Sequence, residues 1–259
     1  MKLFKDLYNY REFLKTNIQK DIRGKYKASF LGVLWSFVNP LLMTLVYAIV
    51  FPYLMRGAEY EHYTTFLVIG ILAWNWFSLS ISLGTFVIIG NGGIIKKVYF
   101  PREILPISVV TSGMINYLIS CIIIAIFLIC SGIGFSWQLV WLPLVILAQY
   151  LLTLAIVFVT CAVNVYVRDL EYIVNFIVQM LFYGTPILYS TKLFEGSKIA
   201  SFINCNPMTV IINCYRDIFY WQNLPHIKSL IVVIISSFIL CLIGLAIFKK
   251  LSKGFAEEV

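Results

Sequence analysis

Residues 104–167 read ILPISVVTSGMINYLISCIIIAIFLICSGIGFSWQLVWLPLVILAQYLLTLAIVFVTCAVNVYV and contain no Asp, Glu, Lys or Arg. A helix rises about 1.5 Å per residue, so about 20 residues cross the roughly 30 Å hydrocarbon core of a bilayer. The stretch is long enough for two crossings. Gly132 and Gly134, followed by Trp137 and Trp141, predict a tight turn with interfacial aromatic side chains between them.

The composition of the whole chain is also that of a membrane protein. Of its 259 residues, 61% are hydrophobic and 12% are charged, whereas soluble domains have about 45–50% apolar and about 25% charged residues. A soluble core of this size cannot hide the excess apolar surface, so lipid must be the solvent for much of the chain. We expect one membrane domain, without room for a separate nucleotide-binding or catalytic domain.

Four further charge-free runs flank the central stretch. The predicted spans are Leu31 to Met55, Tyr63 to Ile95, two within Ile104 to Val167, Tyr172 to Thr191, and Ser229 to Phe248. The sequence therefore predicts an all-α integral membrane protein with six transmembrane helices. Its expected organisation is a cytoplasmic segment at 1–30, a membrane domain at 31–248 and a cytoplasmic tail at 249–259.

The distribution of positive charge predicts the orientation. With the N-terminus inside, 15 of the 20 Lys and Arg residues fall on inner segments and 5 on outer segments. Inner loops of membrane proteins carry the excess of Lys and Arg. An even number of spans then places both termini in the cytoplasm, and we expect a multi-pass membrane protein.

The first 30 residues carry eight Lys and Arg side chains. Their apolar residues fall on one stripe of a helix, at steps of three, four or seven: Phe4, Leu7, Leu14, Ile18 and Ile22. A basic amphipathic helix of this kind lies along the inner membrane surface. The alternative is a solvated positive arm that only fixes the topology.

The connection between the fifth and sixth predicted spans, residues 191–228, is too polar to span and too apolar for a free loop. Asn206-Pro207 marks a turn. Apolar residues then recur at helical steps, at Val210, Ile211, Cys214, Ile218 and Trp221. We predict short helices that dip into the outer leaflet or cap the bundle. Cys205 and Cys214 lie here and could pair only if this segment is extracytoplasmic.

The chain lacks the signatures of an enzyme. It has no Gly-x-x-x-x-Gly-Lys-Ser/Thr phosphate loop, and no span holds a pair of carboxylates for acid–base chemistry. His62 and His226 are far apart and at membrane edges, which favours interfacial positions over a metal site. Ion-coupled carriers usually keep a charged residue near mid-membrane. Since these spans hold none, a transport function would draw its energy from outside the chain.

The spans do contain neutral polar and aromatic side chains. Amides and aromatic rings can hydrogen-bond to and stack on sugars without placing a fixed charge in the membrane. The candidate channel-lining residues are Trp74, Trp76, Asn116, Tyr117, Asn175 and Tyr183. The alternative is that each of them holds neighbouring helices together.

Two short inner segments stand apart from the spans. The first combines charged and aromatic side chains with a proline suited to a first helical turn: Lys96, Lys97, Val98, Tyr99, Phe100, Pro101, Arg102 and Glu103. The second, 168–172, opens the fifth span with Arg168 and Asp169 and places its acids at a helix N-terminus. Both are typical of docking elements, although plain cytoplasmic loops with orientation charges fit as well.

The order of these motifs resembles type-2 ABC exporter permeases of the polysaccharide and polyol-phosphate group, the Wzm-like and TagG-like proteins. The resemblance covers nearly the whole chain. The matching pieces are Arg23 to Trp35 with Asn39 to Leu42, Tyr99 to Pro106, Val167 to Leu170, Thr185 to Tyr189, Asn206 to Met208, and Tyr215 to Asp217. Each piece alone is a weak signal, and their shared order carries the argument.

The resemblance implies a homodimer bound to two copies of a separate ATPase, which would bind ATP and Mg²⁺, so this chain is expected to hold no cofactor or metal. It implies an N-terminal interface helix and coupling helices at 96–103 and 168–172. It also implies outer gate helices within 191–228, which carry Tyr215, Arg216, Asp217 and Trp221. The expected substrate is a glycan on undecaprenyl diphosphate, and no nucleic acid is expected.

Several functions remain open. The resemblance favours O-antigen export, because Wzm-like chains are short like this one, over teichoic acid or capsular glycan export. A type-2 permease for a small lipid or drug is the next alternative. A membrane-embedded glycosyl or acyl transferase needs a cluster of acids or histidines that the loops do not supply. A structural scaffold would leave the docking segments without a purpose.

Overall fold

The computed structural model is described here for residues 8–24, 35–54, 61–191, 196 and 203–259. Parts of the expectations above fall outside these ranges, namely Phe4 and Leu7 of the N-terminal stripe, the limits of the first span at Leu31 and Met55, and part of the 191–228 segment. The described residues are helical, without a strand among them. This agrees with the all-α prediction.

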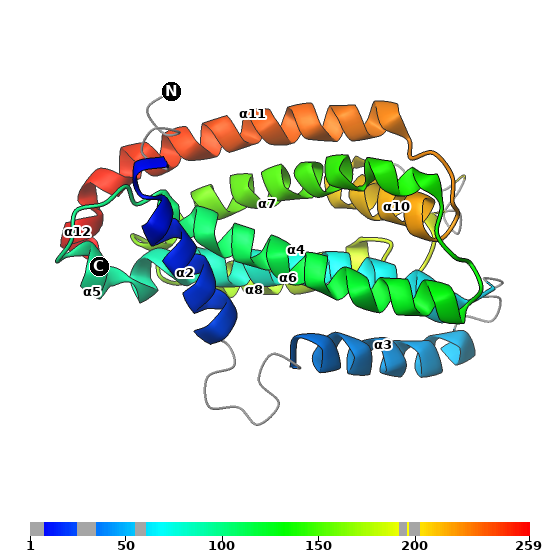
Figure 1. Ribbon diagram of the computed structural model, residues 1–259. Coiled ribbons are helices and arrows are strands. Elements are labelled where there is room, and N and C mark those ends of the chain that lie inside the picture. The colour runs from blue at the N-terminus through cyan, green and yellow to red at the C-terminus, as the bar shows by residue number, and fades with distance from the viewer. Residues whose placement is uncertain (1–7, 25–34, 55–60, 192–195, 197–202) are drawn as a thin grey trace.

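The helices run in chain order as follows. The N-terminal half holds α2 (Arg11–Gly24), α3 (Trp35–Leu54), α4 (Tyr63–Gly90), α5 (Gly92–Ile95) and α6 (Ile104–Cys130). The C-terminal half holds η2 (Trp137–Trp141), α7 (Leu142–Asn164), α8 (Leu170–Gly184), α10 (Pro207–Phe219), α11 (Ile227–Leu251), η4 (Ser252–Gly254) and α12 (Phe255–Glu258). Figure 1 shows the long helices side by side, with α5 and α12 at one end of the bundle and α10 at the other.

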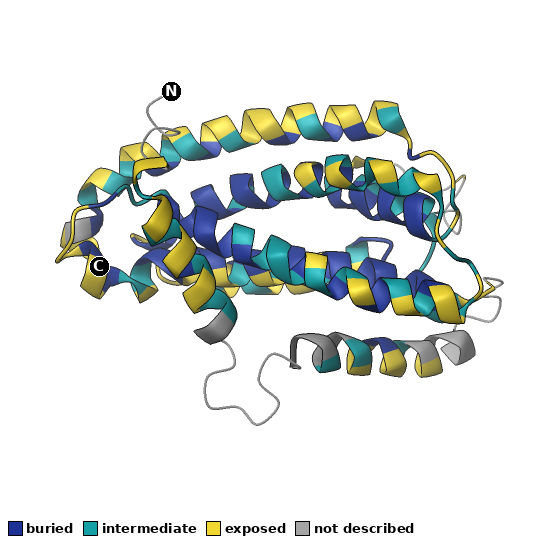
Figure 2. Ribbon diagram, in the orientation of Figure 1, coloured by how far each residue is buried: buried dark blue, intermediate teal, exposed yellow. Residues whose placement is uncertain are grey.

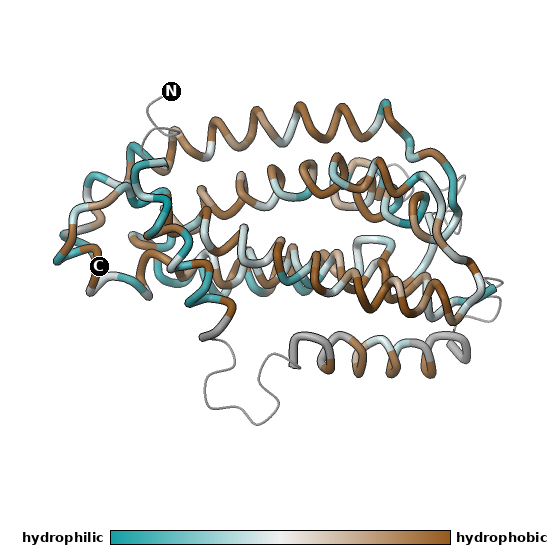
Figure 3. The backbone as a smooth tube through the Cα atoms, in the orientation of Figure 1, coloured by the Kyte–Doolittle hydropathy of each residue, from teal (hydrophilic) through white to brown (hydrophobic). Residues whose placement is uncertain are grey.

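Within the described ranges, four helical segments are long and apolar enough to cross a membrane: Tyr63–Gly90, Ile104–Cys130, Trp137–Asn164 and Ile227–Gly254. Each coincides with a predicted span. The predicted turn between the third and fourth spans is also present, because Gly132 and Gly134 have φ values of 73° and 74°, which favour glycine. Figure 3 shows hydrophobic residues along these helices and hydrophilic ones gathered at the ends and on α2.

The fifth predicted span is shorter than expected. The apolar helix α8 has 15 residues and ends at Gly184, whereas the prediction ran to Thr191. Pro186 lacks a backbone N–H, and the carbonyl oxygens of Pro186 and Ile187 accept hydrogen bonds from the side chain of Arg216. The residue before Pro186 is extended, with φ −106° and ψ 139°, as a following proline favours, so the helix ends before its predicted limit.

The centre of the bundle is α4. It packs against α3, α6, α7, α8 and α10. In the most apolar 18-residue stretch of α4, 72% is buried inside the protein, whereas the corresponding share for the segment that contains α11 is 22%. Figure 2 shows the same contrast, with exposed residues along the outward side of α11. The apolar side chains that remain exposed on α11 are suited to contact with lipid, since hydrocarbon is as apolar as they are.

The N-terminal helix α2 packs against α6 rather than standing free in solution. Leu14, Ile18 and Ile22 are half-buried, as the predicted stripe requires, and the ring of Phe13 lies 4.8 Å from that of Phe100. Lys15 and Lys20 are exposed. The described part of the N-terminal segment is therefore a helix whose apolar side contacts the chain itself. Its position along the inner membrane surface stays a prediction.

A close contact between α7 and α11 gives the first prediction. A Cβ atom added at Gly244 would lie 2.8 Å from the carbonyl oxygen of Ala155 and 3.3 Å from Cβ of Phe158. Overpacking of this kind costs about 1–3 kcal/mol. We expect Gly244→Ala to lower the apparent midpoint of thermal unfolding in detergent by about 2–12 °C. Gly184→Ala, where a Cβ meets nothing within 4 Å, is the matched control, and equal midpoints for the two variants would contradict the prediction.

Candidate functional site

The end of the bundle that holds α5 and α12, called here the inner end, gathers both predicted docking segments. Lys96 and Lys97 form a turn directly after α5, residues 98–101 are irregular, and α6 begins at Ile104. The expected helix at 96–103 is therefore a loop, and the short helix lies just before it. Arg168 and Asp169 form the exposed turn that leads into α8. The side chain of Asn164 accepts a hydrogen bond from the backbone N–H of Glu171 at 3.1 Å and fixes this turn.

The side chains of the first docking segment divide into buried and exposed ones. Tyr99 is 94% exposed and Val98 is 56% exposed, whereas Phe100 is 6% exposed and lies against Phe13 of α2. Pro101, Arg102 and Glu103 are half-buried, and Lys96 and Lys97 are exposed. Phe100 thus anchors the segment, and Tyr99 is the aromatic side chain that a partner can contact.

Residues after α11 complete the inner end, a contribution that the sequence analysis missed. A guanidinium N–H of Arg102 donates to the carbonyl oxygen of Ser252, and the guanidinium lies 5.7 Å from the ring centroid of Phe255. Phe255 is fully buried, with rings of Tyr166 and Phe248 close by. Residues from the predicted cytoplasmic tail, 249–259, therefore pack against the first docking segment.

The opposite end, called here the outer end, is organised by α10. The side chain of Asn206 accepts a hydrogen bond from the backbone N–H of Met208 and caps the helix, and Pro207 occupies its first turn. The Nδ2 group of Asn206 also donates to Oγ1 of Thr185 at 3.0 Å. The predicted turn and short helix are confirmed, and the motif at 206–208 lies against the motif at 185–189.

The predicted gate residues differ sharply in exposure. Arg216 is 2% exposed, and its guanidinium donates to the carbonyl oxygens of Pro186 and Ile187, the latter at 2.6 Å. It also lies 3.5 Å from the ring centroid of Phe66, a cation–π contact. Tyr215 is fully buried, whereas Trp221 is 40% exposed. Arg216 thus joins α10 to the residues that follow α8, and its charge is buried rather than exposed to solvent.

Asp217 is half-buried near His226 at the edge of this end. Burial raises the pKa of the Asp217 carboxyl from 3.8 to about 6, and the charge of His226 opposes this rise. Cys214, its neighbour on α10, is 1% exposed, and all six cysteines are free. The pairing of Cys205 with Cys214 that the sequence left open is absent.

The candidate channel residues fall into two groups. Trp74, Trp76 and Tyr117 are 2–4% exposed and lie inside the protomer, where the rings of Trp76 and Tyr117 stack at 5.3 Å. Asn116 and Asn175 are half-buried, and Asn175 accepts a hydrogen bond from Ser82 at 2.6 Å. Tyr183 of α8 is 63% exposed. A role in lining a channel stays a prediction for all six, and Tyr183 is the most accessible of them.

The described residues of the two ends do not form a metal site. Across the described ranges, no three His, Cys, Asp or Glu side chains gather into a group that could hold a metal ion. The inner end instead presents a charged and aromatic surface, and the outer end presents a buried Arg-to-backbone contact. An exposed surface with charged and aromatic side chains is suited to contact with another protein.

The contacts of Arg216 give the second prediction. Hydrogen bonds to charged groups contribute about 1.5–3 kcal/mol each, and the buried carbonyl oxygens of Pro186 and Ile187 lose donors in Arg216→Gln. We expect a lower unfolding midpoint and faster maleimide labelling of Cys214, read by peptide mass spectrometry. Arg216→Lys should restore little of the lost stability, because one ammonium group does not reproduce the planar, forked set of donors of a guanidinium.

The matched control for this prediction is Arg168→Gln, the same chemical change at an exposed arginine of the inner end. It should leave both the unfolding midpoint and the labelling of Cys214 unchanged. A protected Cys214 together with an unchanged midpoint in Arg216→Gln would show that Arg216 does not hold the outer end together.

Comparison with known proteins agrees with this arrangement. The family model for the ABC-2 type transporter matches residues 12–220. A protein of Myxococcus xanthus named O-antigen export system permease protein RfbA is 33% identical over 100% of both chains. Two proteins of the same name from Klebsiella pneumoniae are 36% and 35% identical over 92% of this chain and 91% of theirs. The chain belongs to the ABC-2 type transporter family, as a membrane-spanning permease.

Proposed function

We propose that the chain is the permease subunit of an ATP-driven exporter that moves undecaprenyl-linked polysaccharide, most directly O-antigen, across the bacterial cytoplasmic membrane. The observation that carries this proposal is the full-length similarity to relatives that are named O-antigen export permeases. The absence of charged residues within the predicted spans supports it, since an ion-coupled carrier needs such residues and an ATP-driven one does not.

The proposal includes a six-span topology with both termini in the cytoplasm. The first and fifth spans would be α3, which has 20 residues and no charged side chain, and α8 with the segment that follows it. The inner end would then face the cytoplasm, where the positive-inside rule places most of the Lys and Arg residues. The outer end with α10 would face the opposite side of the membrane.

Energy would enter at the inner end through a separate ATPase that binds ATP and Mg²⁺. Supporting this assignment, exposed side chains of both docking segments include the aromatic residues Tyr99 and Tyr172, at 94% and 76%. Aromatic side chains are enriched among the residues that dominate protein interfaces. Two permease copies and two ATPase copies would make the transporter, with a glycan channel between the permeases.

The apolar face of α8 supports such a pairing of two permeases. Six large side chains on this helix are between 48% and 76% exposed: Tyr172, Ile173, Phe176, Ile177, Met180 and Tyr183. A face of this kind suits either lipid or a second copy. Tyr183, at the end of α8 nearer the outer end, would then line the exit of the channel with a ring that can stack on sugars.

Affinity purification tests the proposal as a whole. The tagged chain, extracted from native membranes in detergent, should carry a stoichiometric ATPase subunit identified by mass spectrometry. Deletion of its gene should abolish surface O-antigen while lipid-linked glycan accumulates inside the cell. A folded permease without an ATPase, or a deletion strain with normal surface glycan, would contradict the proposal. A deletion that removes capsule or teichoic acid instead would reassign the substrate.

Tyr99 gives a sharper prediction for the inner end. Tyr99→Ala removes an exposed ring without disturbing the buried anchor Phe100, so the permease should keep its unfolding midpoint. We expect ATPase binding to weaken by about tenfold or more, as for a central aromatic residue of an interface. The measurement is co-purification at graded ATPase concentrations, together with export in cells.

Two variants are the controls for Tyr99→Ala. Trp137→Ala removes a ring that is 66% exposed near the outer end, and it should leave ATPase binding unchanged. Phe100→Ala should lower the unfolding midpoint, because it empties a buried site against Phe13. Normal ATPase binding by Tyr99→Ala would show that Tyr99 is not part of the docking surface.

A further inference from the structure

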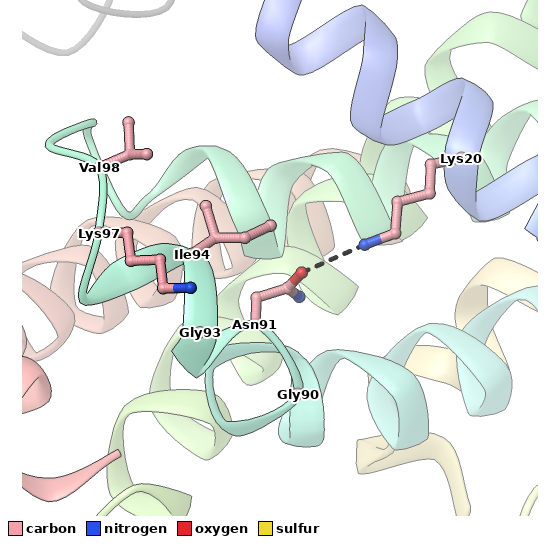
Figure 4. A pocket seen from close by; sticks show the side chains of 7 residues that line it. All are labelled: Lys20, Gly90, Asn91, Gly93, Ile94, Lys97 and Val98. Atoms are coloured by element: carbon pink, nitrogen blue, oxygen red, sulfur yellow. Dashed lines mark hydrogen bonds between the residues drawn. The ribbon is translucent and has the colours of Figure 1, made fainter.

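A cavity of about 380 Å³ lies between α2 and the chain segment 90–98 (Figure 4). Lys20 of α2 lines the cavity, and so does Asn91, the residue that directly follows α4. The Nζ group of Lys20 donates to Oδ1 of Asn91 at 3.4 Å. Two parts of the chain that are far apart in sequence therefore meet at this cavity.

The lining of this cavity is basic. Lys20 and Lys97 both line it, and the described lining residues include no carboxylate. The Nδ2 group of Asn91 donates to the carbonyl oxygen of Val87 at 2.8 Å, which fixes the amide and leaves Oδ1 toward Lys20. Two lysines in a lining that includes no carboxylate attract an anion, and phosphate is an anion that lysine binds readily.

The same cavity has an apolar side. Ile94 and Val98 line it and are 37% and 56% exposed, and a Cβ atom at Gly93 would meet nothing within 4 Å. Contact with exposed Ile and Val side chains does not stabilise a bound free phosphate ion. A molecule with a phosphate group and an attached hydrocarbon contacts both sides of such a site.

The cavity lies where a membrane span ends. The apolar helix α4 stops at Gly90, and the cavity is built from the residues that follow directly. On the topology proposed above, this level is the inner headgroup region, where basic pockets at span ends bind anionic lipid headgroups. The inference rests on the proposed function for this orientation and for undecaprenyl diphosphate as one of the two candidate ligands.

We propose that this cavity is a binding site for the phosphate headgroup of an anionic lipid, held between Lys20 of α2 and Lys97 of the 90–98 segment. The lipid would tie α2 to the first docking segment, because each lysine belongs to one of them. Two lipids share the required chemistry, namely a phospholipid of the membrane and an undecaprenyl diphosphate carrier. The site would serve either as a lipid-dependent brace or as the first contact of the substrate.

Native mass spectrometry of the purified full-length permease tests the site directly. Phosphatidylglycerol, undecaprenyl diphosphate and inorganic pyrophosphate are titrated separately. One lysine near an anionic headgroup contributes an interaction that corresponds to about fivefold in affinity. We expect Lys20→Gln to weaken binding of at least one lipid by about this factor, while Lys20→Arg retains it.

The matched control is Lys15→Gln, which removes the same charge from an exposed position of α2 that does not line the cavity. It should leave affinity within about twofold. If only undecaprenyl diphosphate responds to Lys20→Gln, the substrate carrier is the ligand; if phosphatidylglycerol responds, the site binds membrane phospholipid. Both results support the proposal.

Three results would overturn it: equal weakening by Lys15→Gln and Lys20→Gln, no weakening by Lys20→Gln, or pyrophosphate binding as tight as that of the lipids. Circular dichroism and the unfolding midpoint confirm that each variant is folded. Because lipid binding is measured on the permease alone, a failure here leaves the ATPase co-purification untouched. The two proposals can therefore fail separately.

Discussion

The central interaction of the outer end is the pair of hydrogen bonds from the buried Arg216 to the carbonyl oxygens of Pro186 and Ile187. Backbone groups buried away from water must find partners, and irregular chain at membrane depth is tolerated only where protein supplies them. α8 ends at Gly184, so the residues after it need such partners. Arg216 supplies them from a helix more than twenty residues later, which fixes α10 to the end of α8.

Helix α6 and a group of packed aromatic rings lie between the two ends of the molecule. The first docking segment ends at Glu103, and α6, which contains Tyr117, begins at the next residue. The ring of Tyr117 stacks on Trp76 of α4 and lies 5.4 Å from the ring of Tyr215 on α10. Packed interiors of this kind deform little, so these rings hold α4, α6 and α10 in a fixed arrangement.

Composition and charge-free runs predicted most of the fold, because a helix in lipid needs only length and apolar side chains. The turn at Gly132 and the short helix after Asn206 were also predictable, since glycine and the Asn-Pro pair have strong local preferences. The contacts of Arg216 and Phe255 were not, because they join segments that are distant in sequence. The exposure of single residues was equally unpredictable from the sequence. Tyr99 and Phe100 are neighbours in one motif, yet Tyr99 is exposed and Phe100 is buried.

The packing of Phe255 has a consequence for the order of synthesis. A ribosome makes the docking segment early, whereas Phe255, which contacts Arg102 and Tyr166, follows the last long helix, α11. The inner end therefore reaches its final shape only after α11 has been synthesised. A chain that stalls before this point lacks the contacts of Phe255, so its inner end stays incomplete.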